Sequence, residues 1–284
     1  MTQLLVKVLM APTFVVGASL AGRRFGARVG GLVAGLPVVA LPILLAYALA
    51  HGDSFAAGAA AGTLLGLISL FAFTVVYGRL ASRLAWAPTM LLGWLAFAAS
   101  TAILSTLSVA HGVALALALG GVAVGLALLP RPTPLPAAPP APPRWDLPMR
   151  AACALALVLT LTAISGWLGP QLSGLLAPFP IITTVLATFT HAQRGAAETV
   201  RLLRAMMAGF GAYALFCFTL AITLRELGTA ASFALAAGVA LTVQALLLLA
   251  SRRRRGAAST SAREAVQASL AARAGASPHS RSRR

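Results

Sequence analysis

Gly174-Leu-Leu-Ala-Pro-Phe-Pro180 is the most interrupted part of an otherwise helix-friendly apolar stretch, and Gly31-Leu-Val-Ala-Gly-Leu-Pro37 is its counterpart in the first half of the chain. Sliding the chain over itself by 143 positions, without a gap, aligns these two stretches and several glycines outside them. The aligned pairs include Gly26 with Gly169, Gly31 with Gly174, Ala34 with Ala177, Pro37 with Pro180, Gly52 with Gly195 and Gly66 with Gly209. Glycines and prolines that match in one register indicate duplication more strongly than chance matches of Ala and Leu. The sequence therefore predicts an internal repeat.

The composition is that of a membrane protein. Of the 284 residues, 59% are hydrophobic and only 10% are charged, against roughly 25% charged in soluble domains. The net charge of +17 comes almost entirely from arginines between apolar blocks or in the C-terminal tail. Such arginines report first on membrane topology, so a nucleic-acid partner is disfavoured.

Apolar segments long enough to cross a bilayer as helices recur about nine times along the chain. The connections between them alternate between basic and nearly neutral, and basic connections face the cytoplasm. The basic ones are 23–28, 79–83, 131–150, 194–204 and 252–255. We therefore expect an all-α polytopic membrane helix bundle of about nine spans, with the N-terminus outside and the C-terminus inside.

The predicted organisation has four parts. Residues 1–129 form the first membrane repeat plus an extra fifth span, and residues 149–251 form the second repeat. Between them, residues 130–148 hold nine prolines, which suits an extended cytoplasmic linker. Residues 252–284 are basic and poor in apolar side chains, so we expect a disordered cytoplasmic tail.

The two copies are predicted to be inverted. The repeat period covers five spans, so equivalent helices cross the membrane in opposite directions, in a 4+1+4 arrangement. Gly26 lies in a loop with three arginines, whereas its partner Gly169 lies in a loop with none. Charge and sequence thus independently place equivalent residues on opposite faces.

Paired broken helices in inverted repeats are typical of transporters, which bind substrate at mid-membrane between them. The predicted substrate-binding residues lie in the two interrupted stretches or just after them: Gly31, Ala34, Pro37, Pro42, Gly174, Ala177, Pro178, Pro180, Thr183 and Thr184. The alternative is that the prolines and glycines only shape helix packing. A second packing feature is the ridge of Gly58, Gly62 and Gly66, which we expect to allow close approach of another helix.

Three charged residues are candidates for ion or proton coupling. Asp53 and Glu198 occupy equivalent turns just after the two broken helices. Lys7 lies within the first span, where a charge is costly. Two of them have a simpler alternative, because Lys7 can snorkel to the interface and Glu198 can pair with Arg201 at the inner surface.

The block from Gly174 to Phe216 resembles the small GlpM-type bacterial membrane proteins, in its Ala-Gly-Leu-x-Pro-like run, short polar turn and glycine-bearing next helix. The front half, including Lys7, Pro12-Thr13 and Arg23-Arg24-Phe25-Gly26, resembles uncharacterised bacterial integral membrane proteins. These resemblances cover about half of the chain. They imply a multi-pass protein of the bacterial inner (plasma) membrane and a link to envelope or exopolysaccharide production, and they bring no catalytic residues.

Enzymatic chemistry is disfavoured. His51, Asp53 and Ser54 lie too close together in one turn for a hydrolase triad, and no metal or phosphate motif occurs. Cys153 and Cys217 lie in apolar blocks, so we expect no disulfide, no metal and no cofactor.

The predicted function is a transporter or permease for a small neutral or anionic molecule. The alternative is a non-transporting accessory protein for envelope or exopolysaccharide production. The expected partners are the lipid bilayer, anionic lipids at the basic tail, and either a second copy of the chain or the envelope machinery.

Overall fold

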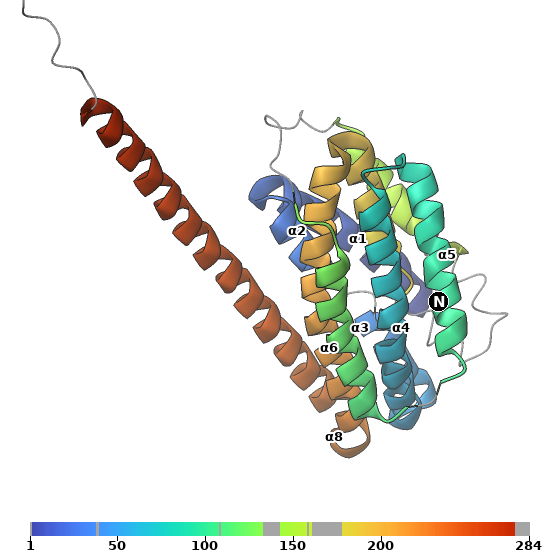
Figure 1. Cartoon of the computed structure of the whole chain (residues 1–284). Coiled ribbons are helices and arrows are strands. Elements are labelled where there is room, and N and C mark those ends of the chain that lie inside the picture. Colours follow the sequence, from blue (N-terminus) through green and yellow to red (C-terminus); the bar gives the residue numbers. More distant parts are fainter. Residues whose placement is uncertain are drawn as a thin grey trace, which may run out of the picture. The chain divides into compact units, whose positions relative to one another are not determined.

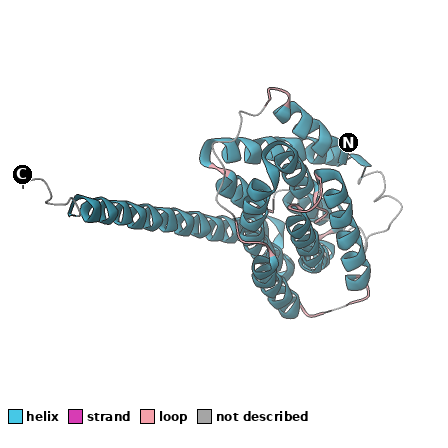
Figure 2. Cartoon of the chain, turned by 45° about the horizontal axis from the view of Figure 1, so that its top comes forward, coloured by secondary structure: helices cyan, strands magenta, loops and turns pink. Residues whose placement is uncertain are grey.

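The computed structural model describes residues 2–37, 40–107, 109–132, 143–157, 159–160 and 178–275, and these residues contain helices and no strand (Figure 1, Figure 2). The all-α prediction is therefore confirmed for the described part of the chain. The chain divides into two compact units, residues 1–244 and residues 245–284. The helices are α1 (Thr2–Phe25), α2 (Ala27–Ala34), α3 (Ala40–His51), α4 (Asp53–Leu80), α5 (Trp86–Leu104), α6 (His111–Leu128) and α8 (Ile181–Gly275).

Four helical stretches are long and apolar enough to cross a membrane. They are Asp53–Leu80, Trp86–Leu104, His111–Leu128 and Ile181–Ala250, and Ala40–His51 is a shorter apolar helix. Because the mean hydropathy of each of the four is high over a window of membrane-spanning length, the membrane character inferred from composition agrees with the helices themselves.

Positive-φ glycines mark the helix boundaries. Gly26 separates α1 from α2 and Gly52 separates α3 from α4, while Gly195 and Gly228 interrupt α8. The backbone of Gly52 (φ 85°, ψ 168°) closely matches that of Gly195 (φ 79°, ψ 178°). This conformation is essentially restricted to glycine. Two glycines that the 143-residue offset pairs in sequence thus make the same helix break.

The core of the first unit surrounds α4 and the segment of α8 between Gly195 and Gly228. α4 packs against α3, α5 and α6, as Figure 1 shows. Phe73 and Tyr77 of α4 and Phe216 of α8 are fully buried. The backbones of α2 and α8 also approach closely where α2 ends, because a Cβ on Gly35 would lie 2.7 Å from the Cα of Gly209.

The predicted glycine ridge on α4 is wrong for two of its three members. A Cβ on Gly58 or Gly62 would meet nothing within 4 Å, so neither glycine lies against another described helix. Gly66, the third member, is buried. The spacing of four residues does place the three glycines on one face of α4. Toward the N-terminus of α4, however, that face points away from the core. The close helix crossing uses Gly35 and Gly209 instead.

Two predicted boundaries also differ. A helix begins at Asp146, inside the expected linker 130–148, and Pro148 fits there because the first turn of a helix tolerates proline. Residues 133–142 of the linker lie outside the described residues. In the second unit, α8 stays helical to Gly275 where we expected disorder from 252. Ala and Arg, which dominate this tail, are strong helix formers.

Candidate functional site

The first interrupted stretch connects α2 to α3. α2 ends at Ala34, Gly35 to Pro37 are not helical, and α3 begins by Ala40. The Pro37 carbonyl accepts a hydrogen bond from the Leu41 amide at 2.9 Å, so Pro37 leads into α3 and does not kink it. Pro42 is the third residue of α3 as described. The described break comprises Gly35 to Pro37, before α3.

The second interrupted stretch precedes α8. Pro178, Phe179 and Pro180 are not helical, and α8 begins at Ile181. The Pro180 carbonyl accepts the Thr184 amide at 2.7 Å, which repeats the hydrogen bond made by Pro37. Prolines at both breaks thus initiate the following helix in the same way.

A small cavity lies between the two interrupted stretches. Its volume is about 30 Å³, which is room for one or two water molecules. Its lining comes from both breaks and from the two helices beside them: Ala34, Leu36, Leu70, Pro178, Phe179, Pro180, Ile181, Ile182, Thr183, Phe210 and Tyr213. The 143-residue offset relates Leu36 to Phe179 and Leu70 to Tyr213. Two sequence-equivalent pairs therefore line one cavity.

Four predicted site residues line this cavity, namely Ala34, Pro178, Pro180 and Thr183. The other described ones lie beside it. A Cβ on Gly31 would lie 2.6 Å from the carbonyl oxygen of Leu202, so Gly31 brings α2 close to α8 and does not face the cavity. Pro37 and Pro42 are buried next to the first break. Gly174 and Ala177 lie outside the described residues.

An aromatic group on α5 supports the second break. Trp94 Nε1 donates a hydrogen bond to Thr184 Oγ1 at 3.1 Å. The Phe179 ring makes an edge contact with Phe97, with ring centroids 5.3 Å apart, and a tilted contact with Trp94 at 6.0 Å. Sequence reasoning missed Trp94 and Phe97. The signal available was a tryptophan in the middle of an apolar span, which needs a partner for its N–H group when it is buried.

The cavity lining has no Asp, Glu, Lys, Arg or His. The rings of Phe179, Phe210 and Tyr213 supply apolar contact area, and hydroxyl groups come from Thr183 and Tyr213. This chemistry suits a small neutral molecule with an apolar part and few hydrogen-bonding groups.

Two of the coupling candidates, Asp53 and Glu198, do not line this cavity. Asp53 is the first residue of α4, where a negative charge is favoured by the helix dipole, and its Oδ1 accepts a hydrogen bond from Thr229 Oγ1 at 2.6 Å. Glu198 is buried, with Oε1 4.0 Å from Arg194 Nη1 and no partner for Oε2. The structure gives Glu198 an ion pair with Arg194, four residues earlier, and the suggested pairing with Arg201 stays a prediction. The side chain of Lys7 lies outside the described part of the chain.

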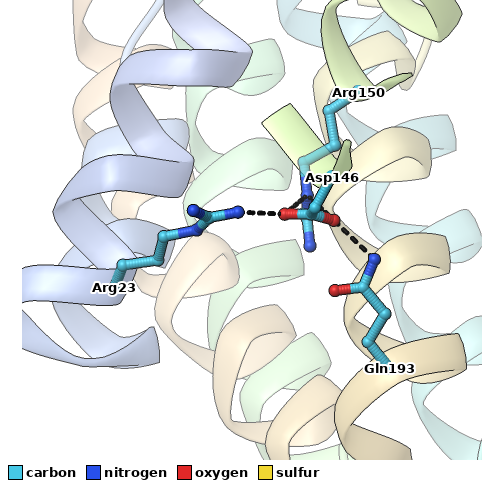
Figure 3. A network of polar contacts seen from close by, with 4 residues as sticks. All are labelled: Arg23, Asp146, Arg150 and Gln193. Carbon is cyan, nitrogen blue, oxygen red and sulfur yellow. Dashed lines mark hydrogen bonds and ion pairs between the residues drawn. The ribbon is translucent and has the colours of Figure 1, made fainter. Parts of the chain in front are cut away.

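A buried ionic network that the sequence reasoning missed centres on Asp146 (Figure 3). Its carboxylate accepts hydrogen bonds from Arg23 Nη2 at 2.5 Å, from Arg150 Nε at 2.9 Å and from Gln193 Nε2 at 2.5 Å. The Asp146 side chain is only 1% exposed. Burial by itself raises the pKa of Asp146, but the hydrogen bond from Arg23 and the charge of Arg150 outweigh it, so the pKa lies below its usual value. The available signal was one aspartate in a connection full of arginines.

The described residues contain no group of three His, Cys, Asp or Glu side chains placed to hold a metal ion. Comparison with protein-family models, curated proteins and solved structures finds no match to this chain. The relation to GlpM-type proteins therefore stays a prediction from the residues that suggest it.

Proposed function

We propose that the chain is an integral membrane transporter that moves a small molecule through a site between the two interrupted stretches. The observation that carries this proposal is the cavity lined by both breaks and by the equivalent pairs Leu36/Phe179 and Leu70/Tyr213. Transporters with paired broken helices bind substrate at such a junction. Because the lining has no charged side chain, a neutral substrate is favoured over an anionic one.

The proposed architecture is nine spans in an inverted 4+1+4 repeat. The breaks at Gly195 and Gly228 would divide the apolar part of α8 into three spans, and α2 with α3 would make one interrupted span. Residues 196–227 form one continuous helix of about 48 Å at 1.5 Å per residue. Gly195 lies at one end of this helix, and Asp53, next to Gly52, contacts Thr229 at its other end. Equivalent glycines at opposite ends of one helix support inversion.

The proposed orientation, with the N-terminus outside and the C-terminus inside, is supported by contacts between connections. Basic connections are expected to face the cytoplasm, and each such contact joins segments that this rule places on the same side of the membrane. Arg23 binds Asp146, Arg79 donates to the Leu128 carbonyl and Arg204 donates to the Leu129 carbonyl, all within predicted inner connections or at the span end that leads into one. These contacts support a bacterial inner-membrane protein with its basic connections in the cytoplasm.

The second candidate function is a non-transporting accessory protein of envelope production. The small volume of the cavity favours it, because about 30 Å³ holds water but no metabolite. A transporter in this state would have to open before it could load its substrate. The two functions therefore differ in whether the cavity opens to either face.

Thiol labelling tests this difference. With Cys153 and Cys217 replaced by Ala, the single-cysteine variants Ala34→Cys and Thr183→Cys would be exposed to a small membrane-impermeant maleimide in right-side-out and inside-out vesicles. A transporter that alternates access should be labelled at both positions from both faces. Ser54→Cys, at an exposed position, is the positive control. If only this control reacts, the cavity stays closed and the accessory function is favoured.

A further inference from the structure

A second cavity lies along the same two helices as the first. Its volume is about 40 Å³, and its lining combines small or apolar residues with charged and hydroxyl side chains from α1, α2, the helix that begins at Asp146, and α8. α2 contributes Gly30 to this cavity and Ala34 to the first. α8 contributes Thr183 to the first and Thr190 to the second. Thr190 follows Thr183 by seven positions in the helix, which is about 10 Å along the axis.

Closely packed residues separate the two cavities. Leu186 and Leu202 are 2% and 5% exposed. A Cβ on Gly31 would lie 2.6 Å from the Leu202 carbonyl oxygen and 2.7 Å from the Ala205 Cβ. The structure therefore has the first cavity closed toward the end of the bundle where Arg23 and Asp146 lie.

Asp146 ties three segments together at that end. Arg23 comes from α1, Arg150 from the same helix as Asp146, and Gln193 from the first segment of α8 (Figure 3). Arg150 also lies over the Phe189 ring, with its guanidinium carbon 5.1 Å from the ring centroid. Movement of α1 away from α8 would have to break this network, which includes a charge that is almost fully buried.

A second carboxylate in the same cavity has unused hydrogen-bonding capacity. Glu198 Oε2 and Ser19 Oγ are buried without partners, and both residues line the cavity. Arg23, Arg150 and Arg194 also line this cavity, so three guanidinium groups share two carboxylates. Both oxygens of Asp146 have partners, whereas only one oxygen of Glu198 does. A guanidinium group that leaves Asp146 therefore has an alternative acceptor, which is what a two-state ionic switch requires.

We propose that the Asp146 network is the inner gate of the pathway through the first cavity. In the closed state Arg23, Arg150 and Gln193 hold Asp146, and in the open state guanidinium contacts pass to Glu198. The second cavity is then the vestibule that the gate closes. This proposal rests on the proposed transport function, and its test separates the two.

The test measures the labelling rate of Ala34→Cys, in the cysteine-free background, from each face of the membrane. Asp146→Asn removes the charge that holds the closed state, so the rate from the inner face should rise by about tenfold or more and the rate from the outer face should fall. Glu198→Gln removes the acceptor of the open state and should lower the inner rate. Opposite signs for two nearby substitutions are not expected if the network only holds the fold together.

Asp53→Asn is the matched control, because it removes an aspartate contact at the other end of the same bundle and should not raise inner labelling. If Asp146→Asn does not fold, Gln193→Leu removes one donor to Asp146 and leaves both arginines, and it should raise inner labelling in the same direction. The gate is overturned, and transport left intact, if Ala34→Cys is labelled from both faces in the protein that keeps Asp146 and Gln193 and the rates do not change in the Asp146 and Gln193 variants. No labelling in any variant overturns both.

Discussion

The close backbone contact between the end of α2 and α8 gives the sharpest stability prediction. Gly35 follows α2 with φ of −78°, a conformation open to any residue, so Gly35→Ala strains no dihedral angle. The added Cβ, however, would lie 2.7 Å from the Cα of Gly209 and 2.9 Å from its carbonyl carbon. Ordinary contact begins at 3.4 Å, so α2 and α8 must separate by about 0.7 Å. Overpacking of this kind costs about 1–3 kcal/mol.

Gly62→Ala is the matched control. It adds the same methyl group where nothing lies within 4 Å, in a helix interior where Ala is intrinsically favoured over Gly by about 0.5–1 kcal/mol. We therefore expect Gly35→Ala to unfold at lower temperature than the parent protein and Gly62→Ala to match or exceed it. For globular domains of 150–250 residues, each kcal/mol corresponds to roughly 2–4 °C.

Cys217 offers a direct assay, because its side chain is fully buried and should react with a thiol-reactive dye only when the protein unfolds. In a Cys153→Ala background, purified protein in detergent would be heated with a fluorogenic maleimide. The reverse ranking, with Gly35→Ala as stable as the parent and Gly62→Ala destabilised, would show that α2 and α8 do not cross at Gly35 and Gly209.

Four further predictions follow from the site and the network. Asp146→Asn should destabilise the folded protein by about 3–5 kcal/mol at neutral pH, measured with the same dye, because it leaves Arg150 buried without its counter-ion. Because the pKa of Asp146 is lower in the folded state, ionised Asp146 should stabilise the folded protein at neutral pH, and this stabilisation should be lost as pH falls below the usual aspartate range. The Asn variant should lack this pH dependence. Arg204→Ala removes hydrogen bonds to the carbonyls of Leu126 and Leu129, at 2.8 Å each, and should increase the rate of proteolysis in the connection after α6. A proteolysis rate equal to that of the parent protein would show that these bonds do not hold the connection in place. Fused reporters that are active only outside should work after His51, His111, Ser173 and Glu226, and cytoplasmic ones after Arg28, Arg83, Pro140 and Arg194; equal results at Arg28 and Ser173 would refute the inverted repeat.

The interrupted stretches could be predicted because their signal is local. Proline lacks an amide hydrogen, and positive φ excludes most side chains, so Pro37, Pro180, Gly52 and Gly195 mark breaks wherever the surrounding helices lie. The predicted duplication suggested that these breaks belong together, and four of the predicted site residues line one cavity.

Features that depend on helix rotation could not be predicted in this way. Gly58 and Gly62 have the spacing of a packing ridge, but spacing does not say which face of α4 is covered. The Asp146 network joins residues 123 and 47 positions apart in sequence, through side chains whose meeting depends on where α1, α8 and the intervening helix pack. A single aspartate among arginines signals a charge partner without identifying it.

Among the described residues, the polar contacts at the two ends of the proposed pathway differ. At the proposed inner end, Asp146 is 1% exposed and is held by two guanidinium groups and an amide. At the proposed outer end, the side-chain hydrogen bond described between the start of α4 and α8 runs from Thr229 to Asp53. Hydrogen bonds with two charged partners are stronger than those with one, and burial raises the cost of separating the partners. If the network is a gate, the resting protein should therefore be closed on the inside and open more readily to the outside. Without substrate, Ala34→Cys should then react faster from the outer face, and a faster inner reaction would contradict this order of strengths.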